Sequence, residues 1–294
     1  MFAAQTARDL RQSLVRIEHW TGSAYPGDSR LHQALTVLDA VASSGQFVVD
    51  DTAGTSTMRA IQLALDTSAI AYALPDQRVA DLRKDLQTTG VGPLLGDEAM
   101  QALQAQSQLI VRAAFYRAGV KPSQPTHSGA GGRKKPDILI ENGTANHPVE
   151  VKRPTSAKNV VPRALDAAEQ IRHSGSKGGM VIDVTDCLRD AAPDTADDAV
   201  VAHAEAISRQ LFVHGSDWKP GYSHVLMVGV MARPAWHLDL IGDNEGQVLI
   251  HSTSCVAAFG TARGTLDTLR GHWLRKNLEA GLNRIGFTSE ATTS

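Results

Sequence analysis

Hydrophobic positions in the first hundred residues recur at the spacing of α-helices. Leu10, Leu14 and Ile17 follow one another at intervals of three or four residues, which places them on one face of a helix. The same spacing recurs in three further stretches and predicts a helix in each: 31–42, 56–74 and 77–86. The pattern breaks at Leu94-Leu95-Gly96. We therefore expect residues 1–96 to form a mostly helical N-terminal region.

Beyond residue 97, short apolar runs alternate with longer helical patterns. A helix is expected over residues 97–118, because Gly119 suits a helix C-terminus. Two short apolar runs, 138–140 and 149–151, flank polar residues that include Asn142-Gly143, a pattern typical of a β-hairpin. Later segments predict helices at 161–173 and 196–212 and strands at 180–184, 224–231, 236–241 and 247–251.

The C-terminal segment has the pattern of an amphipathic helix. Its apolar face is expected to cover the core and contains Leu266, Leu269, Trp273, Leu274, Leu278 and Leu282. From residue 97 onward the order is thus helix, hairpin, helix, strand, helix, strands and helix. This order predicts an α/β domain over residues 97–294, in which helices flank a mixed sheet.

Composition excludes several classes of protein. Of the 294 residues, 42% are apolar and 20% are charged, and the formal net charge is -2. Any nucleic-acid binding must therefore use a local basic patch. The two cysteines form neither a disulfide framework nor a Cys-x-x-Cys site. Such sparse cysteines are typical of a protein of the reducing cytoplasm, which is where we expect this one. The longest apolar run, 225–232, is too short to span a bilayer, so no membrane segment is expected.

Two acidic residues and a lysine stand out in the hairpin. Glu150 and Lys152 are two positions apart, so they project from the same face of a strand. Asp137 opens the first strand and can approach Glu150 across the pair. Two carboxylates suit Mg²⁺, which takes oxygen ligands and completes its shell with water and substrate phosphate. Lys152 could then orient the attacking water or offset charge in the transition state.

These residues resemble the signature of the PD-(D/E)XK nucleases, also called restriction-endonuclease-like. The signature reads Pro136-Asp137, a gap of twelve residues, and Glu150-Val151-Lys152. The resemblance covers roughly residues 97–184, and it implies a core of helix, hairpin, helix and strand. It also implies hydrolysis of phosphodiester bonds with Mg²⁺, for which Mn²⁺ can substitute.

The resemblance assigns a role to each of these positions. Asp137 and Glu150 correspond to the metal-binding acids, Val151 offers its backbone carbonyl as a further ligand, and Lys152 corresponds to the catalytic lysine. Many members carry a glutamate on the preceding helix. Gln108 stands near that position here, and its amide oxygen attracts a cation more weakly, so binding of a second metal stays open.

The resemblance extends to the helix that follows the hairpin. Gln170 lies where some members place a glutamine that supports the site or the substrate. Asp183 and Asp186 follow the strand 180–184. Both are expected in turn or capping roles, with support of the site as the alternative.

Basic residues are concentrated around the hairpin. Residues 117–177 contain eleven basic and five acidic side chains, a local charge of +6 in a chain whose total is -2. Such an excess favours binding to phosphate, although a solvated run of charges has the same composition. The residues expected to bind substrate are Arg133, Lys134, Lys135, Arg153, Lys158, Arg163 and Gln170.

The sequence therefore predicts a Mg²⁺-dependent endonuclease that acts on DNA. The family implies roles such as restriction and phage defence. Cleavage of both strands would need two sites, which favours a homodimer, and residues 1–96 suit binding to a separate partner protein. The alternative is a non-catalytic nucleic-acid-binding or assembly protein that retains a nuclease-like fold, and an exposed hairpin with ordinary surface charges also stays open.

Overall fold

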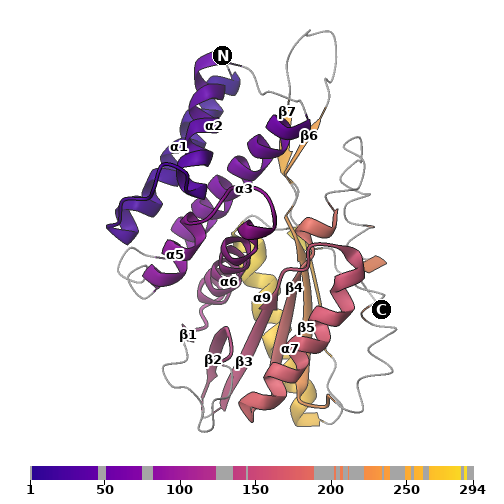
Figure 1. Ribbon diagram of the computed structural model, residues 1–294. Coiled ribbons are helices and arrows are strands. Elements are labelled where there is room, and N and C mark those ends of the chain that lie inside the picture. The colour runs from indigo at the N-terminus through magenta and orange to yellow at the C-terminus, as the bar shows by residue number, and fades with distance from the viewer. Residues whose placement is uncertain are drawn as a thin grey trace. The chain divides into compact units, whose positions relative to one another are not determined.

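The chain forms two compact units. The computed structural model describes residues 2–45, 51–74, 82–123, 135–143, 145–188, 202, 206–207, 211, 222–233, 235–238, 249–252, 255–260, 265–285 and 288–289 (Figure 1). The first unit consists of Met1–Ile110 with Pro234–Thr253, and the second of Val111–Arg233 with Ser254–Ser294. We expected a boundary at residue 97. The division falls instead within one continuous helix, α6 (Met100–Arg117), where periodicity gives no signal.

The first unit is mostly helical, as the spacing of its apolar residues predicts. Its helices are α1 (Phe2–Thr21), α2 (Arg30–Ser44), α3 (Asp51–Ala73), α5 (Arg83–Gly90) and the first part of α6. Helices α1, α2 and α3 pack against one another around a core that includes Leu14, Leu31 and Leu38. The antiparallel strands β6 (Ala235–Leu238) and β7 (Leu249–Ser252) belong to this unit, and β6 contacts α3.

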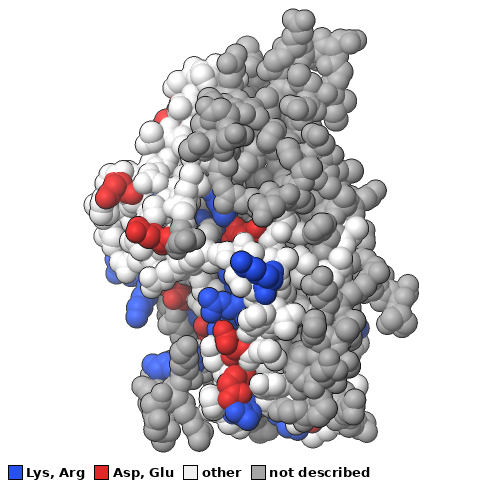
Figure 2. Space-filling view, turned by 45° about the vertical axis from the view of Figure 1, so that its right-hand side comes forward, with Lys and Arg blue, Asp and Glu red and all other residues white. Residues whose placement is uncertain are grey.

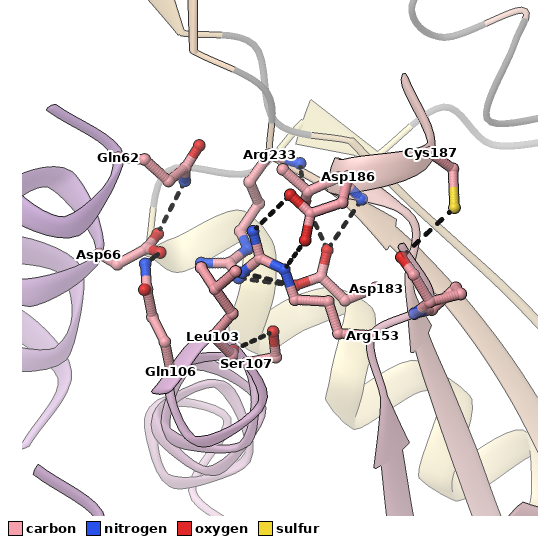
Figure 3. Close-up of polar contacts among 12 residues, drawn as sticks. Gln62, Asp66, Leu103, Gln106, Ser107, Arg153, Asp183, Asp186, Cys187 and Arg233 are labelled. Atoms are coloured by element: carbon pink, nitrogen blue, oxygen red, sulfur yellow. Dashed lines mark hydrogen bonds and ion pairs between the residues drawn. The ribbon is translucent and has the colours of Figure 1, made fainter. Parts of the chain in front are cut away.

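A buried polar network joins four helices of this unit. Arg30, which is fully buried, donates from Nη2 to Gln106 Oε1 at 2.5 Å and from Nη1 to the Thr89 carbonyl at 3.1 Å. Gln106 in turn donates to Asp66, which also accepts from Gln62 at 3.3 Å (Figure 3). Gln106 therefore links the buried arginine Arg30 to the buried carboxylate of Asp66.

The second unit is built on a seven-stranded mixed sheet in the order β1-β2-β3-β4-β5-β8-β9. Strand β2 pairs antiparallel with β3. Strands β3, β4 and β5 are parallel to one another, and β5 pairs antiparallel with β8. In this order, β1 to β5, β8 and β9 span Pro122–Ser123, Ile138–Asn142, Ala145–Lys152, Gly178–Asp183, Val225–Ala232, Cys255–Gly260 and Thr288–Ser289. This confirms the predicted α/β class and the predicted hairpin. The pattern did not reveal β1, β8 or β9.

Helices cover both faces of this sheet. Helix α7 (Val160–Ser174) connects β3 to β4 and packs on both, and in Figure 1 it lies in front of them. Helix α9 (Thr265–Arg284) packs on β5 and β8. A Cβ added at Gly229 would lie 2.8 Å from Leu278 and 3.5 Å from Val181. The face of β4 that carries Val181 is therefore the one that α9 covers.

The apolar face of α9 is only partly buried. Leu274, Leu278 and Leu282 are fully buried, whereas Leu266 and Leu269 are each 60% exposed. The prediction that these two leucines cover the core was therefore wrong. Periodicity shows which side of a helix is apolar, but only packing shows where along its length the cover begins, and here burial begins at Gly271.

Some expected elements lie outside the described residues. Most of the expected helix 196–212 does, as do residues 239–241 and 247–248 of the two expected strands. Of the helices that the structure describes, none is both long enough and apolar enough to cross a bilayer.

Close packing of α9 leads to a stability prediction. A Cβ at Gly281 would overlap the carbonyl oxygen of Ala114 on α6, within the second unit. Alanine is the better helix former by about 1 kcal/mol, yet we expect Gly281→Ala to lower the free energy of unfolding by about 1–3 kcal/mol, because overpacking outweighs propensity.

Urea denaturation followed by circular dichroism measures this effect. Lys276→Ala is the control, because Lys276 is exposed on the same helix and should change stability by no more than about 0.5 kcal/mol. A Gly281→Ala protein as stable as the wild type would contradict the close packing of α9 on α6.

Candidate active site

The hairpin brings the two predicted acidic residues together. Ile138 of β2 pairs with Val149 of β3, so the same register places Asp137 opposite Glu150. Asp137 Oδ2 accepts a hydrogen bond from the Val151 amide at 2.9 Å. The approach of Asp137 to the Glu150 segment, which the sequence predicts, is therefore present in the structure.

Glu150 and Lys152 project together toward α7. Lys152 Nζ lies 3.3 Å from Glu150 Oε2 and donates a hydrogen bond of 3.0 Å to Gln170 Oε1 on α7. Glu150 is fully buried, while 14% of the Lys152 side chain is exposed. The lysine thus has its ammonium group held between a strand carboxylate and a helix amide, with an opening to solvent.

Burial makes ionisation of Glu150 unfavourable. The pKa of Glu150 is raised to about 8, mainly by desolvation and secondly by the negative charge of Asp137. Lys152 opposes both effects and lowers this pKa, but without cancelling them. Glu150 Oε1 also accepts no hydrogen bond from the described part of the chain. The nearby positive charge and hydrogen-bond donors therefore do not offset the cost of ionising the buried Glu150 carboxyl group.

The oxygen atoms at this site are ligands that suit a hard divalent cation. A cation would offset the negative charges of Asp137 and Glu150, and Mg²⁺ often takes one or two carboxylates with water. The Val151 carbonyl points to the same side of β3 as its amide, toward Asp137, because both groups of a strand residue face one neighbour. Within the described ranges, no group of three or more His, Cys, Asp and Glu side chains gathers to hold a metal.

The other predicted residues lie in different surroundings. Gln108 is half-buried on α6 but belongs to the first unit, so its role as a ligand stays a prediction. Arg133 and Lys134 lie outside the described residues. Lys135 and Lys158 are exposed, and neither makes an ion pair within the described part of the chain.

The local excess of basic residues is partly neutralised at the surface. Arg163 is exposed and lies 3.4 Å from Asp166 one turn along α7. Arg172 pairs with Glu169, and Lys177 lies 2.5 Å from Asp267 on α9. Each of these three pairs uses a basic residue of the predicted basic segment 117–177. Figure 2 accordingly shows positive and negative side chains alternating on the face in view.

The structure corrects the role expected for Arg153. Its side chain is fully buried and makes a forked contact with Asp186, at 2.7 Å from Nε and 3.3 Å from Nη2 (Figure 3). A side chain enclosed in this way is not available to bind substrate. The sequence shows only that a basic residue follows Lys152. Burial depends on β4 and on the turn after it, which are remote in sequence.

Asp183 and Asp186 form part of the same buried cluster. Asp183 accepts from the Thr185 amide at 3.1 Å, which is the turn role that the sequence predicts. Its Oδ2 also lies 2.7 Å from Arg233 Nη2 and 3.6 Å from Arg153 Nη1. Arg233 was missed because no local pattern marks a buried arginine at the end of an apolar strand.

Fold and site together define an α/β protein with two acidic residues and a lysine at one end of adjacent strands. Comparisons with family models, with curated proteins and with solved structures find no match for this chain. Any assignment of function therefore rests on the geometry of the site itself.

The raised pKa of Glu150 leads to a prediction on pH. In the folded protein the proton is held up to about pH 8, and in the unfolded chain only up to about 4.5. The folded state thus binds more protons between these values, and its stability falls as pH rises through that window. We expect Glu150→Gln to remove this loss in metal-free protein. The check is thermal unfolding in EDTA from pH 5 to 8.5, with Glu141→Gln, an exposed carboxyl on β2, as control.

Addition of Mg²⁺ tests the same electrostatics. Metal binds the ionised carboxylates, so its stabilising effect should grow toward pH 8.5 in the wild type and be absent in Glu150→Gln. An equal stabilisation of both proteins would argue against Glu150 as a ligand.

Proposed function

We propose that this protein is a Mg²⁺-dependent nuclease that hydrolyses phosphodiester bonds, with DNA as its substrate, and that its second unit is a restriction-endonuclease-like core. The observation that carries the proposal is the buried Glu150, which lies beside Asp137 and has Lys152 at 3.3 Å. A purely structural site would have no need of a buried carboxyl group whose ionisation is opposed by the negative charge of a second one. A cation removes that repulsion.

Asp137, Glu150 and the Val151 carbonyl would hold the metal. When bound, Mg²⁺ supplies Lewis acidity toward a phosphate oxygen and a lower pKa for attacking water. The remaining steps belong to the chain. Lys152, fixed by Gln170 at 3.0 Å, donates from Nζ toward a phosphoryl oxygen or orients the water. Because Glu150 is buried, these charges act where water screens them little.

Substrate would enter on the side where Lys152 is open to solvent. Lys135 and Lys158 are exposed basic residues at the ends of the segments that lead into and out of the hairpin. They are the described basic residues best suited to hold the phosphate backbone, since Arg163 is paired with Asp166. Phosphate contacts of this kind position a nucleic acid without reading its sequence.

Cleavage assays test the proposal. With Mg²⁺ or Mn²⁺, we expect the wild type to cut DNA, and expect Glu150→Gln and Lys152→Met each to lower the rate by about 100-fold or more, as loss of one transition-state contact does. Plasmid, linear duplex, single-stranded DNA and RNA are compared to define the substrate.

Two surface variants serve as matched controls for these substitutions. Glu141→Gln and Lys276→Ala alter an exposed acid and an exposed lysine and should keep wild-type rates. If folded wild type binds nucleic acid but cuts none of the four substrates, the proposal fails in favour of a non-catalytic binding protein.

Salt dependence tests the proposed phosphate contact of Lys158. We expect Lys158→Ala to weaken binding of duplex DNA equally for all sequences and to reduce the slope of log K against log[salt] by about 0.9, the value for one phosphate contact. The measurement is fluorescence anisotropy in EDTA, which prevents cleavage. Lys177→Ala is the control, because Lys177 already pairs with Asp267. Equal slopes for wild type and Lys158→Ala would exclude this contact.

A further inference from the structure

Three parallel strands of the second unit end at one buried ionic cluster. Strands β3, β4 and β5 end at Lys152, Asp183 and Ala232, and parallel strands bring their carboxyl ends to the same edge of a sheet. The cluster residues stand at these ends: Arg153 directly follows β3, Asp183 closes β4, and Arg233 directly follows β5. Asp186 lies in the short 3-10 helix η4 (Thr185–Leu188) after β4.

The contacts within the cluster form a continuous chain from β3 to β5. Arg153 binds Asp186 through two nitrogens and lies 3.6 Å from Asp183 Oδ2. The same Asp183 oxygen accepts from Arg233 at 2.7 Å. Thr185 donates its amide to Asp183 at 3.1 Å and accepts from the Arg233 amide at 2.9 Å. The cluster therefore fixes backbone as well as side chains (Figure 3).

The backbone pairing of β3 extends further along β4 than along β2. The backbone pairing of β3 with β2 runs no further than Val149, whose partner is Ile138. Beyond that point, the Val151 amide donates a hydrogen bond to the side chain of Asp137, the residue that precedes β2. On the other side, β4 pairs with β3 up to Lys152. The next residue, Arg153, is the one that enters the cluster.

We propose that Arg153 is a positioning residue, which holds the end of β3 so that Val151 and Lys152 keep their places in the site. Its effect on cleavage rests on the nuclease function proposed above. Its effect on the backbone does not. The guanidinium forms a planar fork that matches the Asp186 carboxylate, so it fixes direction as well as distance. Since successive residues are joined by one rigid peptide unit, this anchor acts on Lys152 directly.

The test compares Arg153→Met with Arg233→Met in the full chain. Both substitutions remove one arginine from the same buried cluster, but only Arg153 adjoins the site. We expect Arg153→Met to speed hydrogen exchange of the Val151 amide at least tenfold, relative to the Val181 amide in β4. In Mg²⁺ it should lower kcat at least tenfold and change KM less than threefold. Arg233→Met should leave Val151 exchange and kcat within threefold of the wild type.

The other possible results separate the positioning role of Arg153 from the proposed nuclease function. Unchanged Val151 exchange in Arg153→Met, or an equal increase in both variants, would overturn the positioning role, because the cluster would then serve stability only. A wild type that does not cleave removes the proposed function, and the exchange result still decides the role of Arg153. If Arg153→Met does not fold, Asp186→Asn, which is isosteric, should speed Val151 exchange at least threefold, and no change would again overturn the role.

Discussion

Glu150 carries a carboxyl group into the interior of the second unit, and Asp137 places another carboxyl group beside it. Burial of a charge is costly unless hydrogen bonds and opposite charges compensate it. Here compensation is incomplete, since Lys152 contacts one oxygen and the other accepts no hydrogen bond from the described residues. The ionised site is therefore unfavourable in free energy by itself. Under this condition a bound cation would stabilise the site most.

The neighbouring ionic cluster is arranged in the opposite way. Two arginines and two aspartates are buried together, so that Asp183 and Asp186 balance Arg153 and Arg233. The first unit solves a related problem with Gln106, which links Arg30 to Asp66.

The sheet topology explains why these two groups of charges are close together. Glu150 and Lys152 lie near the end of β3, and the cluster closes the same ends of β3, β4 and β5. Helix α7 follows β3 and returns the chain to β4, which brings Gln170 to within 3.0 Å of Lys152. One crossover therefore supplies both the support for the lysine and the parallel strand that pairs with the site segment.

The sequence by itself determined the hairpin, the common face of Glu150 and Lys152, and the approach of Asp137. These features depend on a period of two and a short turn, which are local properties of the chain. Only the tertiary structure decided that Arg153 is buried, that Arg233 joins it, that Leu266 and Leu269 are exposed, and that α6 continues across the boundary between the units. The burial of a side chain depends on elements distant in sequence, and residue type and spacing do not contain that information.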